Sequence, residues 1–405
     1  MSTADVHAVN DAARRRQLPA LTGARFVAAL AVVVYHLWRW DAWTVPGVVE
    51  HVVGGLSVAV SFFFVLSGFV LAWSGLRDDG SLWLPTTAFW RGRLRRLAPT
   101  FWLATVVAVP TAVALLHRSG LEGTGVVRAV VLDAALSLSF LQAFVPGHEL
   151  AINPPAWSLS AEMFFSLLFP LLAPPLFRLR AGTAVVALVG LWLLSWLPGV
   201  LYLVLDPDGL SAAGIAVDHR AHAVVLDVLR YHPVLRLPEF LAGIFAARLF
   251  LDARRGPASA AVVAVVVVIA VLALGLPAPL VHNGLLVPAF IMLVLALASM
   301  STTLSTTLSP TLPSTWSRWW QRLGDSSYAL YLLHVPLLYW VGGMSMRRLG
   351  RNVLDEPVAA VVVVVAIVVV AVAVSLVPVF GGRRVGICNV GLGSDSHPKT
   401  GGGST

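Results

Sequence analysis

The chain has 405 residues, of which 58% are hydrophobic and only 12% are charged. Soluble domains carry about a quarter of their residues as Asp, Glu, Lys or Arg, so this composition excludes a soluble enzyme, a disordered chain and a fibrous protein. The apolar runs are long and continuous instead of alternating, which excludes a membrane β-barrel. The sequence therefore predicts an all-α fold, a polytopic transmembrane helix bundle.

Apolar stretches of about 20 residues, the length that crosses a bilayer, recur along the chain. We predict ten spans, with expected limits at 22–40, 52–75, 98–117, 158–177, 183–205, 233–251, 258–276, 283–299, 327–343 and 357–380. The further stretch 126–145 is interrupted by Arg128 and Asp133. We expect it to be re-entrant or to lie at the membrane surface.

Basic residues near the span ends predict the orientation, because cytoplasmic loops are enriched in Lys and Arg. Arginines at 14, 15 and 16 precede the first span, and arginines at 77, 91, 93, 95 and 96 follow the second. With ten spans, both termini are then cytoplasmic, and we expect a multi-pass protein of the cytoplasmic membrane. This orientation leaves the arginines at 347, 348 and 351 outside. The net charge of +8 thus points to a lipid bilayer and not to nucleic acid.

The chain divides into three expected parts. Residues 1–20 form a cytoplasmic N-terminal segment, 21–380 a transmembrane domain, and 381–405 a polar tail predicted to be disordered. The single cysteine, Cys388, lies in that tail, which excludes a disulfide framework and a cysteine-based metal site. No metal is expected.

Polar side chains inside the first predicted span are expensive, and two of them are singled out as candidates for function. Arg25 and His36 are eleven residues apart. At about 100° per residue they share one face of a helix, about 16 Å apart along its axis. Taken singly, Arg25 is also explained as a snorkelling anchor and His36 as an interfacial histidine. The shared face favours a functional pair.

Two clusters contain charged residues three positions apart. Arg93 and Arg96 are three residues apart and so are neighbours on a helical turn. Their planar guanidinium groups suit phosphate oxygens, although topology alone also predicts a basic cytoplasmic loop here. Arg236 and Glu239 are likewise three apart, and we interpret them as a structural ion pair at a helix start.

Two further clusters flank prolines. In Asn-Pro-Pro-Ala-Trp-Ser158, the serine is a candidate helix cap, and Glu162 follows one turn later. That carboxylate can pair with an Arg, orient a His, or simply favour the helix N-terminus. His334 lies in an apolar stretch two residues before Pro336, which frees backbone groups. A buried structural histidine is the equal alternative there.

Together these residues resemble the acyltransferase 3 family of integral membrane acyltransferases, from about Leu18 to about Leu376. Each block is weak alone, but five occur in the family's order. They are Arg25 with His36 eleven residues later, Phe-Phe-Phe-Val-Leu-Ser67-Gly68-Phe, the Arg93/Arg96 pair, Trp157-Ser-Leu-Ser-Ala-Glu162, and Ser327-Tyr-Ala-Leu-Tyr-Leu-Leu-His334.

The resemblance implies transfer of an acetyl or other short acyl group from acyl-CoA, as co-substrate, to a hydroxyl acceptor such as a glycan, a lipid or a macrolide. It implies a catalytic set of His36, Arg25 and Glu162. His36 would act as general base and then acid, or as a nucleophile that forms acyl-histidine. Arg93 and Arg96 would bind the CoA phosphates.

The same resemblance gives Ser158, Tyr331 and His334 supporting roles. The sequence departs from the family in the block 57–61, which reads Ser-Val-Ala-Val-Ser where the family usually has Gly and an acidic residue. It also lacks the usual Glu-x-Pro after the last span. No SGNH-type hydrolase domain follows, so we expect a stand-alone enzyme that acylates macrolides or other small glycosylated metabolites.

Two other functions stay open from the residues alone. One is a proton-coupled transporter of a small molecule that uses Arg25 and His36 as a relay. The other is a non-catalytic membrane partner. Release of the CoA thiol in the presence of an acceptor distinguishes the enzyme from both.

Overall fold

The computed structural model describes residues 18–39, 47–208, 224–253, 258–307 and 314–380, which form helices and no named β-strand. The helices are α2 (Pro19–Arg39), α3 (Val48–Gly55), η1 (Leu56–Val58), α4 (Ala59–Gly75), α5 (Thr86–Arg118), α6 (Thr124–Leu138), η2 (Gln142–Phe144), η3 (Pro154–Ala156), α7 (Trp157–Phe177), α8 (Ala181–Leu205), α10 (Val224–Tyr231), α11 (Pro233–Ala253), α12 (Ser259–Ala273), α13 (Ala278–Leu280), η4 (Val281–Leu285), α14 (Val287–Thr307), α15 (Ser314–Leu349), η5 (Val353–Asp355) and α16 (Pro357–Leu376).

The predicted polytopic helix bundle is confirmed, and each of the ten expected spans coincides with a helix. Within the described residues, seven helical stretches are long and apolar enough to cross a membrane, namely Pro19–Arg39, Val48–Gly75, Thr86–Arg118, Pro154–Phe177, Ala181–Leu205, Trp319–Leu349 and Pro357–Leu376. An eighth consists of α13–η4 and α14, which meet at a 41° bend. The two remaining predicted spans correspond to α11 and α12. Helix α11 carries four charged residues, and α12 has only 15 residues, shorter than the other membrane-length helices. Which side of the membrane holds the termini stays a prediction.

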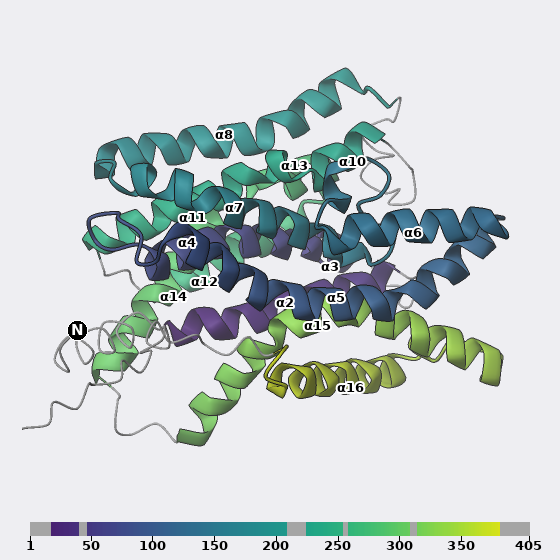
Figure 1. Ribbon diagram of the computed structural model, residues 1–405. Coiled ribbons are helices and arrows are strands. Elements are labelled where there is room, and N and C mark those ends of the chain that lie inside the picture. Colours follow the sequence, from purple (N-terminus) through teal and green to yellow (C-terminus); the bar gives the residue numbers. More distant parts are fainter. Residues whose placement is uncertain (1–17, 40–46, 209–223, 254–257, 308–313, 381–405) are drawn as a thin grey trace, which may run out of the picture.

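The stretch 126–145 forms the 15-residue helix α6 and the short turn η2. A helix of this length is about 22 Å long, shorter than the ~30 Å hydrocarbon core. It folds back along the C-terminal half of α5 (Figure 1). At the end of α6, the carbonyl of Leu138 accepts from the indole of Trp102, in the middle of α5, at 3.1 Å. This geometry fits a surface or re-entrant segment better than a span.

Two local expectations were wrong. The basic segment 91–96 is not a loop, because α5 begins at Thr86 and carries it on its first turns before continuing into the expected span. Ser158 does not cap α7, which begins one residue earlier, at Trp157. Its hydroxyl instead donates back to the carbonyl of Pro155 at 3.0 Å. The segments 1–17 and 381–405, expected to be a cytoplasmic arm and a disordered tail, lie outside the described residues.

Helices α8 and α16 lie at opposite edges of the bundle in Figure 1, with α2, α4, α11 and α15 between them. The edge helices are apolar all round and expose many valine and leucine side chains. In a membrane protein such faces contact lipid. The interior is aromatic: Phe165 of α7 stacks on Phe240 of α11 at 5.0 Å between ring centroids.

The most extensive helix contact in the described bundle is between α4 and α11. A Cβ atom on Gly68 would lie 1.9 Å from the carbonyl oxygen of Phe240, and one on Gly243 would lie 2.0 Å from that of Val65. The two backbones therefore touch through a pair of glycines. Small residues at a crossing are a common way for membrane helices to pack closely.

Gly68→Ala should therefore destabilise the bundle by roughly 3 kcal/mol or prevent its folding, because the new methyl group has no room against a backbone oxygen. The measurement is the yield and thermal stability of the purified protein in detergent. Gly190→Ala is the matched control, since nothing lies within 4 Å of a Cβ at that helical position. Equal stability of the two variants would contradict this packing.

Candidate active site

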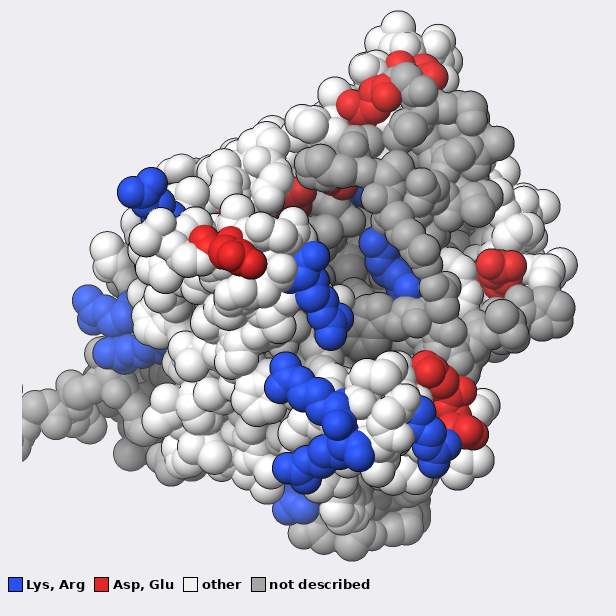
Figure 2. Space-filling model, turned by 90° about the vertical axis from the view of Figure 1, so that its right-hand side faces the viewer, with Lys and Arg blue, Asp and Glu red and all other residues white. Residues whose placement is uncertain are grey.

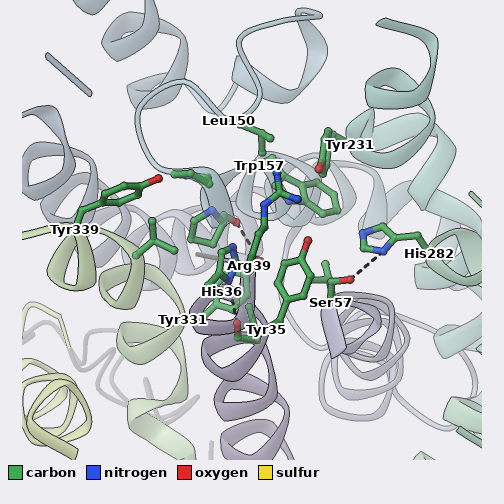
Figure 3. A pocket seen from close by; sticks show the side chains of 15 residues that line it. Tyr35, His36, Arg39, Ser57, Leu150, Trp157, Tyr231, His282, Tyr331 and Tyr339 are labelled. Atoms are coloured by element: carbon green, nitrogen blue, oxygen red, sulfur yellow. Dashed lines mark hydrogen bonds between the residues drawn. The ribbon is translucent and has the colours of Figure 1, made fainter. Parts of the chain in front are cut away.

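A cavity of about 170 Å³ lies where the C-terminal half of α2 meets α15, the start of α7 and the break before α14. We call it the histidine cavity (Figure 3). Its lining residues are Val32, Tyr35, His36, Arg39, Ser57, Val60, Leu150, Pro154, Pro155, Trp157, Tyr231, His282, Tyr331, Val335 and Tyr339. The lining combines aromatic rings with hydroxyl, imidazole and guanidinium groups, and the described residues contribute no carboxylate to it. The face of the molecule at this end of α2 is hollowed near its centre, with arginine side chains beside the hollow (Figure 2).

Two predicted site residues meet at the wall of this cavity, which His36 lines and behind which His334 is buried. The imidazole of His334, on α15, lies against that of His36, on α2, with Nε2 of His334 3.2 Å from Nδ1 of His36. The ring planes are inclined at 63° to each other, with centroids 4.9 Å apart. His334 is fully buried. It is therefore a buried, packed histidine that also contacts His36, and its supporting role stays a prediction.

The backbone fixes the tautomer of both rings. Nδ1 of His36 lies 2.9 Å from the carbonyl oxygen of Val32, and Nδ1 of His334 lies 3.1 Å from that of Leu330. A carbonyl can only accept, so each Nδ1 carries the proton and each neutral ring has an unprotonated Nε2. Nε2 of His334 then accepts from His36. Nε2 of His36 keeps its lone pair, which is the arrangement a general base requires.

His334 should accordingly act as a positioning residue for His36. We expect His334→Ala to lower kcat about tenfold with little change in KM, because His36 loses the acceptor that stabilises its protonated form. His334→Gln should recover part of the loss, since its amide oxygen reaches the position of Nε2, whereas His334→Asn should not. Equal kinetics for the Gln and Asn variants would contradict this role.

Helix α15 is held in place around His334 by the segment before α7. Pro336 has no N–H, so the carbonyl of Leu332 loses its helical donor; Asn153 supplies one from its amide nitrogen at 2.9 Å. The hydroxyl of Tyr331 donates to the carbonyl of Pro155 at 3.0 Å. The same hydroxyl oxygen lies 2.8 Å from the hydroxyl oxygen of Ser158. The predicted supporting residues Ser158 and Tyr331 thus orient the cavity wall.

The other predicted residues form a second group, the arginine cluster, which consists of Arg25, Arg93, Arg96 and Glu162. The guanidinium of Arg93 forms an ion pair with Glu162 and donates to the hydroxyl of Ser166 at 3.0 Å. Ser67 donates to the same carboxylate at 2.7 Å. Arg25 and Arg96 lie within electrostatic range of this pair and of Asp325.

The cluster carries three arginines against the carboxylates of Glu162 and Asp325. An excess of guanidinium groups beside a membrane-embedded site is suited to an anion, and Arg binds phosphate oxygens in a bidentate manner. Arg96 is exposed at the start of α5, whereas Arg93 and Glu162 are largely buried. Arg96 is thus the exposed member of this cluster, and its predicted role in binding phosphate stays a prediction.

The expected catalytic set is therefore divided. His36 lies in the histidine cavity, whereas Arg25 and Glu162 belong to the arginine cluster, about three helical turns away along α2. A ligand that joins the two groups must be elongated. At a separation of about three helical turns, Arg25 and His36 are too far apart to pass a proton directly from one to the other.

Several cavity residues were missed by sequence reasoning. Arg39 lies one turn after His36 and could have been found from that spacing, and Trp157 starts a block already singled out. Ser57 and His282, which lie 3.2 Å apart from Oγ to Nδ1, come from segments distant in sequence. The predicted ion pair of Arg236 and Glu239 is present at 3.1 Å and is fully buried.

Comparison with known proteins decides the family. The profile described as "Acyltransferase domain" of the acyltransferase 3 family matches residues 18–377. The chain belongs to this family. The match covers the described bundle from the start of α2 to the end of α16, and it confirms the resemblance inferred from the five sequence blocks.

Curated relatives of this acyltransferase-family chain come from several bacteria. It is 39% identical over 158 residues to "Acyltransferase MdmB" of Streptomyces mycarofaciens, a match that spans 38% of the chain and 39% of that relative. It is 29% identical over 285 residues to "Exopolysaccharide production protein ExoZ" of Rhizobium meliloti, covering 69% and 75% of the two chains. It is 26% identical over 169 residues to "Putative O-acetyltransferase SACOL0978" of Staphylococcus aureus, covering 39% of the chain and 25% of that relative. No solved structure matches the chain significantly.

Proposed function

We propose that this protein is an O-acyltransferase that moves an acetyl or other short acyl group from acyl-CoA to a hydroxyl of a carbohydrate or of a glycosylated metabolite such as a macrolide. The observation that carries the proposal is the tautomer-fixed His36, whose unprotonated Nε2 belongs to a cavity lined by hydroxyl and aromatic side chains. Family membership and the relatives named as acyltransferases support the reaction type.

In this mechanism His36 takes the proton of the acceptor hydroxyl on Nε2 while the hydroxyl oxygen attacks the thioester carbonyl carbon. The new C–O bond forms, the C–S bond breaks, and the thiolate of CoA takes the proton back from His36. The transient imidazolium is stabilised by the bonds from Nδ1 to the Val32 carbonyl and to Nε2 of His334. Atoms and protons balance without a further reactant.

The donor is proposed to bind along the length of α2. Its phosphates would contact Arg93, Arg96 and Arg25, and its pantetheine arm would carry the thioester toward His36. An extended arm suits the separation of about 16 Å between the two groups on α2. The predicted orientation places the arginine cluster toward the cytoplasm, the compartment that holds acyl-CoA.

The test is release of the CoA thiol from acetyl-CoA by the purified protein in detergent. The acceptors are methyl glycosides of glucose and galactose and a glycosylated macrolide with free sugar hydroxyls. We expect acceptor-dependent thiol release together with acetylated product detected by mass spectrometry. The proposal would be contradicted if none of these acceptors gave thiol release or acetylated product. Transport of an acceptor without acetylation would favour the carrier.

A further inference from the structure

Two tyrosines of the histidine cavity have no part in the proposed chemistry at His36. Tyr35 lies on α2, directly before His36, and Tyr231 is the last residue of α10. Both side chains line the cavity and are partly buried. We call them the tyrosine pair. Because they are distant in sequence, the packing of the bundle, and not a local pattern, brings them to one cavity.

Each ring of the tyrosine pair is held by an aromatic neighbour. The ring of Tyr35 meets that of His36 edge-on, with centroids 5.0 Å apart. The ring of Tyr231 packs edge-on against the indole of Trp157, also at 5.0 Å. Trp157 is only 4% exposed and contacts the ring of Phe64 in turn, at 5.9 Å. Aromatic contacts of this kind contribute about 0.5–1.5 kcal/mol each beyond burial, so they restrict how far the two phenol rings can turn.

The hydroxyl groups of the tyrosine pair differ from those of tyrosines elsewhere in the bundle. The hydroxyl of Tyr202 donates to Asp208 at 2.9 Å, and that of Tyr328 donates to the carbonyl of Leu97 at 2.7 Å. Neither hydroxyl of the pair forms a hydrogen bond with a residue in the described part of the chain. A buried tyrosine hydroxyl usually has a partner. These two are therefore free to bond a molecule that enters the cavity.

The two hydroxyls face the same space. They lie within electrostatic range of each other, and in Figure 3 they point toward one another across the cavity. His36 reaches this space from the position after Tyr35 on α2. A ligand that bonds both phenols is thus held beside the imidazole that is proposed to take a proton from it.

The chemistry of this space fits a neutral ring that carries several hydroxyl groups. A phenol hydroxyl both donates and accepts, as does each hydroxyl of a sugar. Among the described lining residues there is no carboxylate to pair with a cationic ligand. The volume of about 170 Å³ is below the roughly 300–1,000 Å³ of pockets that enclose a drug-sized ligand. The cavity therefore suits a single sugar ring and is too small for a whole macrolide.

We propose that the tyrosine pair binds one neutral sugar ring of the acceptor, each phenol bonding one hydroxyl, with Trp157 as a positioning residue for Tyr231. Another hydroxyl of the same ring is then presented to Nε2 of His36 for attack on the thioester. The inference rests on the proposed function and deepens it, because it names the part of the acceptor that the cavity recognises. The rest of a glycosylated acceptor stays outside the cavity.

Binding in the absence of any acyl donor tests the placement of the sugar. Saturation-transfer NMR with the wild-type protein in phospholipid nanodiscs, free of glycoside detergent, should show transfer to the ring protons of methyl glucoside or methyl galactoside. The double variant Tyr35→Phe/Tyr231→Phe keeps both rings and removes only the hydroxyls. Its signal should fall about 3-fold or more, as loss of two hydrogen bonds predicts.

The matched control for this experiment is Tyr202→Phe. Its hydroxyl bonds Asp208, and the residue is not part of the cavity lining, so the transfer should equal that of the wild type. No transfer from the wild-type protein to either glycoside, or equal transfer from the double variant, would overturn the proposal whether or not acyl transfer is observed.

Kinetics with acetyl-CoA and the methyl glycoside that is acylated test the two contacts one at a time. Tyr35→Phe and Tyr231→Phe should each raise the acceptor KM about 3- to 10-fold, as loss of one hydrogen bond predicts, and leave the KM for acetyl-CoA unchanged. Deoxy-glycosides that lack one hydroxyl at a time locate the partner of each phenol. With the glycoside that lacks the bonded hydroxyl, the Phe variant should have no further effect.

Three kinetic results would overturn the proposal: an unchanged acceptor KM, a loss confined to kcat, or a loss of the same size with every deoxy-glycoside. A wild-type protein that binds the glycoside but releases no CoA thiol would instead contradict the proposed function, while the tyrosine pair would remain the sugar site.

Discussion

His36→Ala is expected to lower acyl transfer by roughly 10²- to 10⁴-fold, because it removes the group that takes the acceptor proton. The protein should still fold, since His36 is only partly buried and its ring packs at the cavity wall. The measurement is acceptor-dependent release of the CoA thiol by the purified variant, normalised to the amount of monodisperse protein.

His117→Ala is the matched control for this variant. Its Nδ1 lies 2.8 Å from the carbonyl of Val113, the same bond to the preceding turn that His36 makes, but it is exposed at the end of α5. This control should retain wild-type transfer. Full activity in His36→Ala would contradict the proposed general base, and equal loss in both variants would indicate an effect on folding instead.

Glu162→Ala should be the most destabilising change in the arginine cluster. It removes the ion-pair partner of Arg93 and the acceptor of the Ser67 hydroxyl, and the side chains of the pair are only 11% and 16% exposed. Loss of one partner of a buried pair costs about 3–5 kcal/mol, since the remaining charge is left uncompensated. Thermal unfolding of the protein in detergent measures this loss. Glu162→Gln, which keeps the shape of the side chain, should lose less.

The double variant Arg93→Ala/Glu162→Ala separates the ion pair from other effects. We expect it to be less destabilised than the sum of the single variants, because removing both charges leaves none unpaired. Glu356→Ala is the control, since its pair with Arg351 is more than half exposed and such surface pairs contribute about 0–1 kcal/mol. Strict additivity at Arg93 and Glu162 would contradict a coupled buried pair.

Much of the fold could be predicted because the bilayer imposes one length on every span. Hydropathy even located α11, in spite of its charged residues, and the short α12. The start of α5 was missed because its first turns are basic and exposed, and hydropathy does not distinguish a polar helix from a loop. Helix propensity of the individual residues is too weak a signal to decide such a boundary.

The site could be predicted only where one helix carries it. Arg25 and His36 share a face of α2, as spacing indicated, but their partners come from other helices. The contact of His36 with His334 joins residues 298 apart and depends on how α2 packs on α15, which no local pattern encodes. His282 is placed by a broken helix, and a His-Asn-Gly sequence alone does not predict where a break points.

The central claim is that the arginine cluster holds the donor's phosphates while its acyl group reaches His36. The most direct measurement is a cryo-EM structure of the protein with a non-hydrolysable thioether analogue of acetyl-CoA. We predict phosphate density at Arg93 and Arg96 and the acyl carbonyl carbon in the histidine cavity. The gap between that carbon and Nε2 of His36 should have room for an acceptor hydroxyl, whose oxygen would then lie about 3–3.5 Å from the carbon it attacks. Phosphates bound away from the cluster, or an acyl group outside the histidine cavity, would contradict the account.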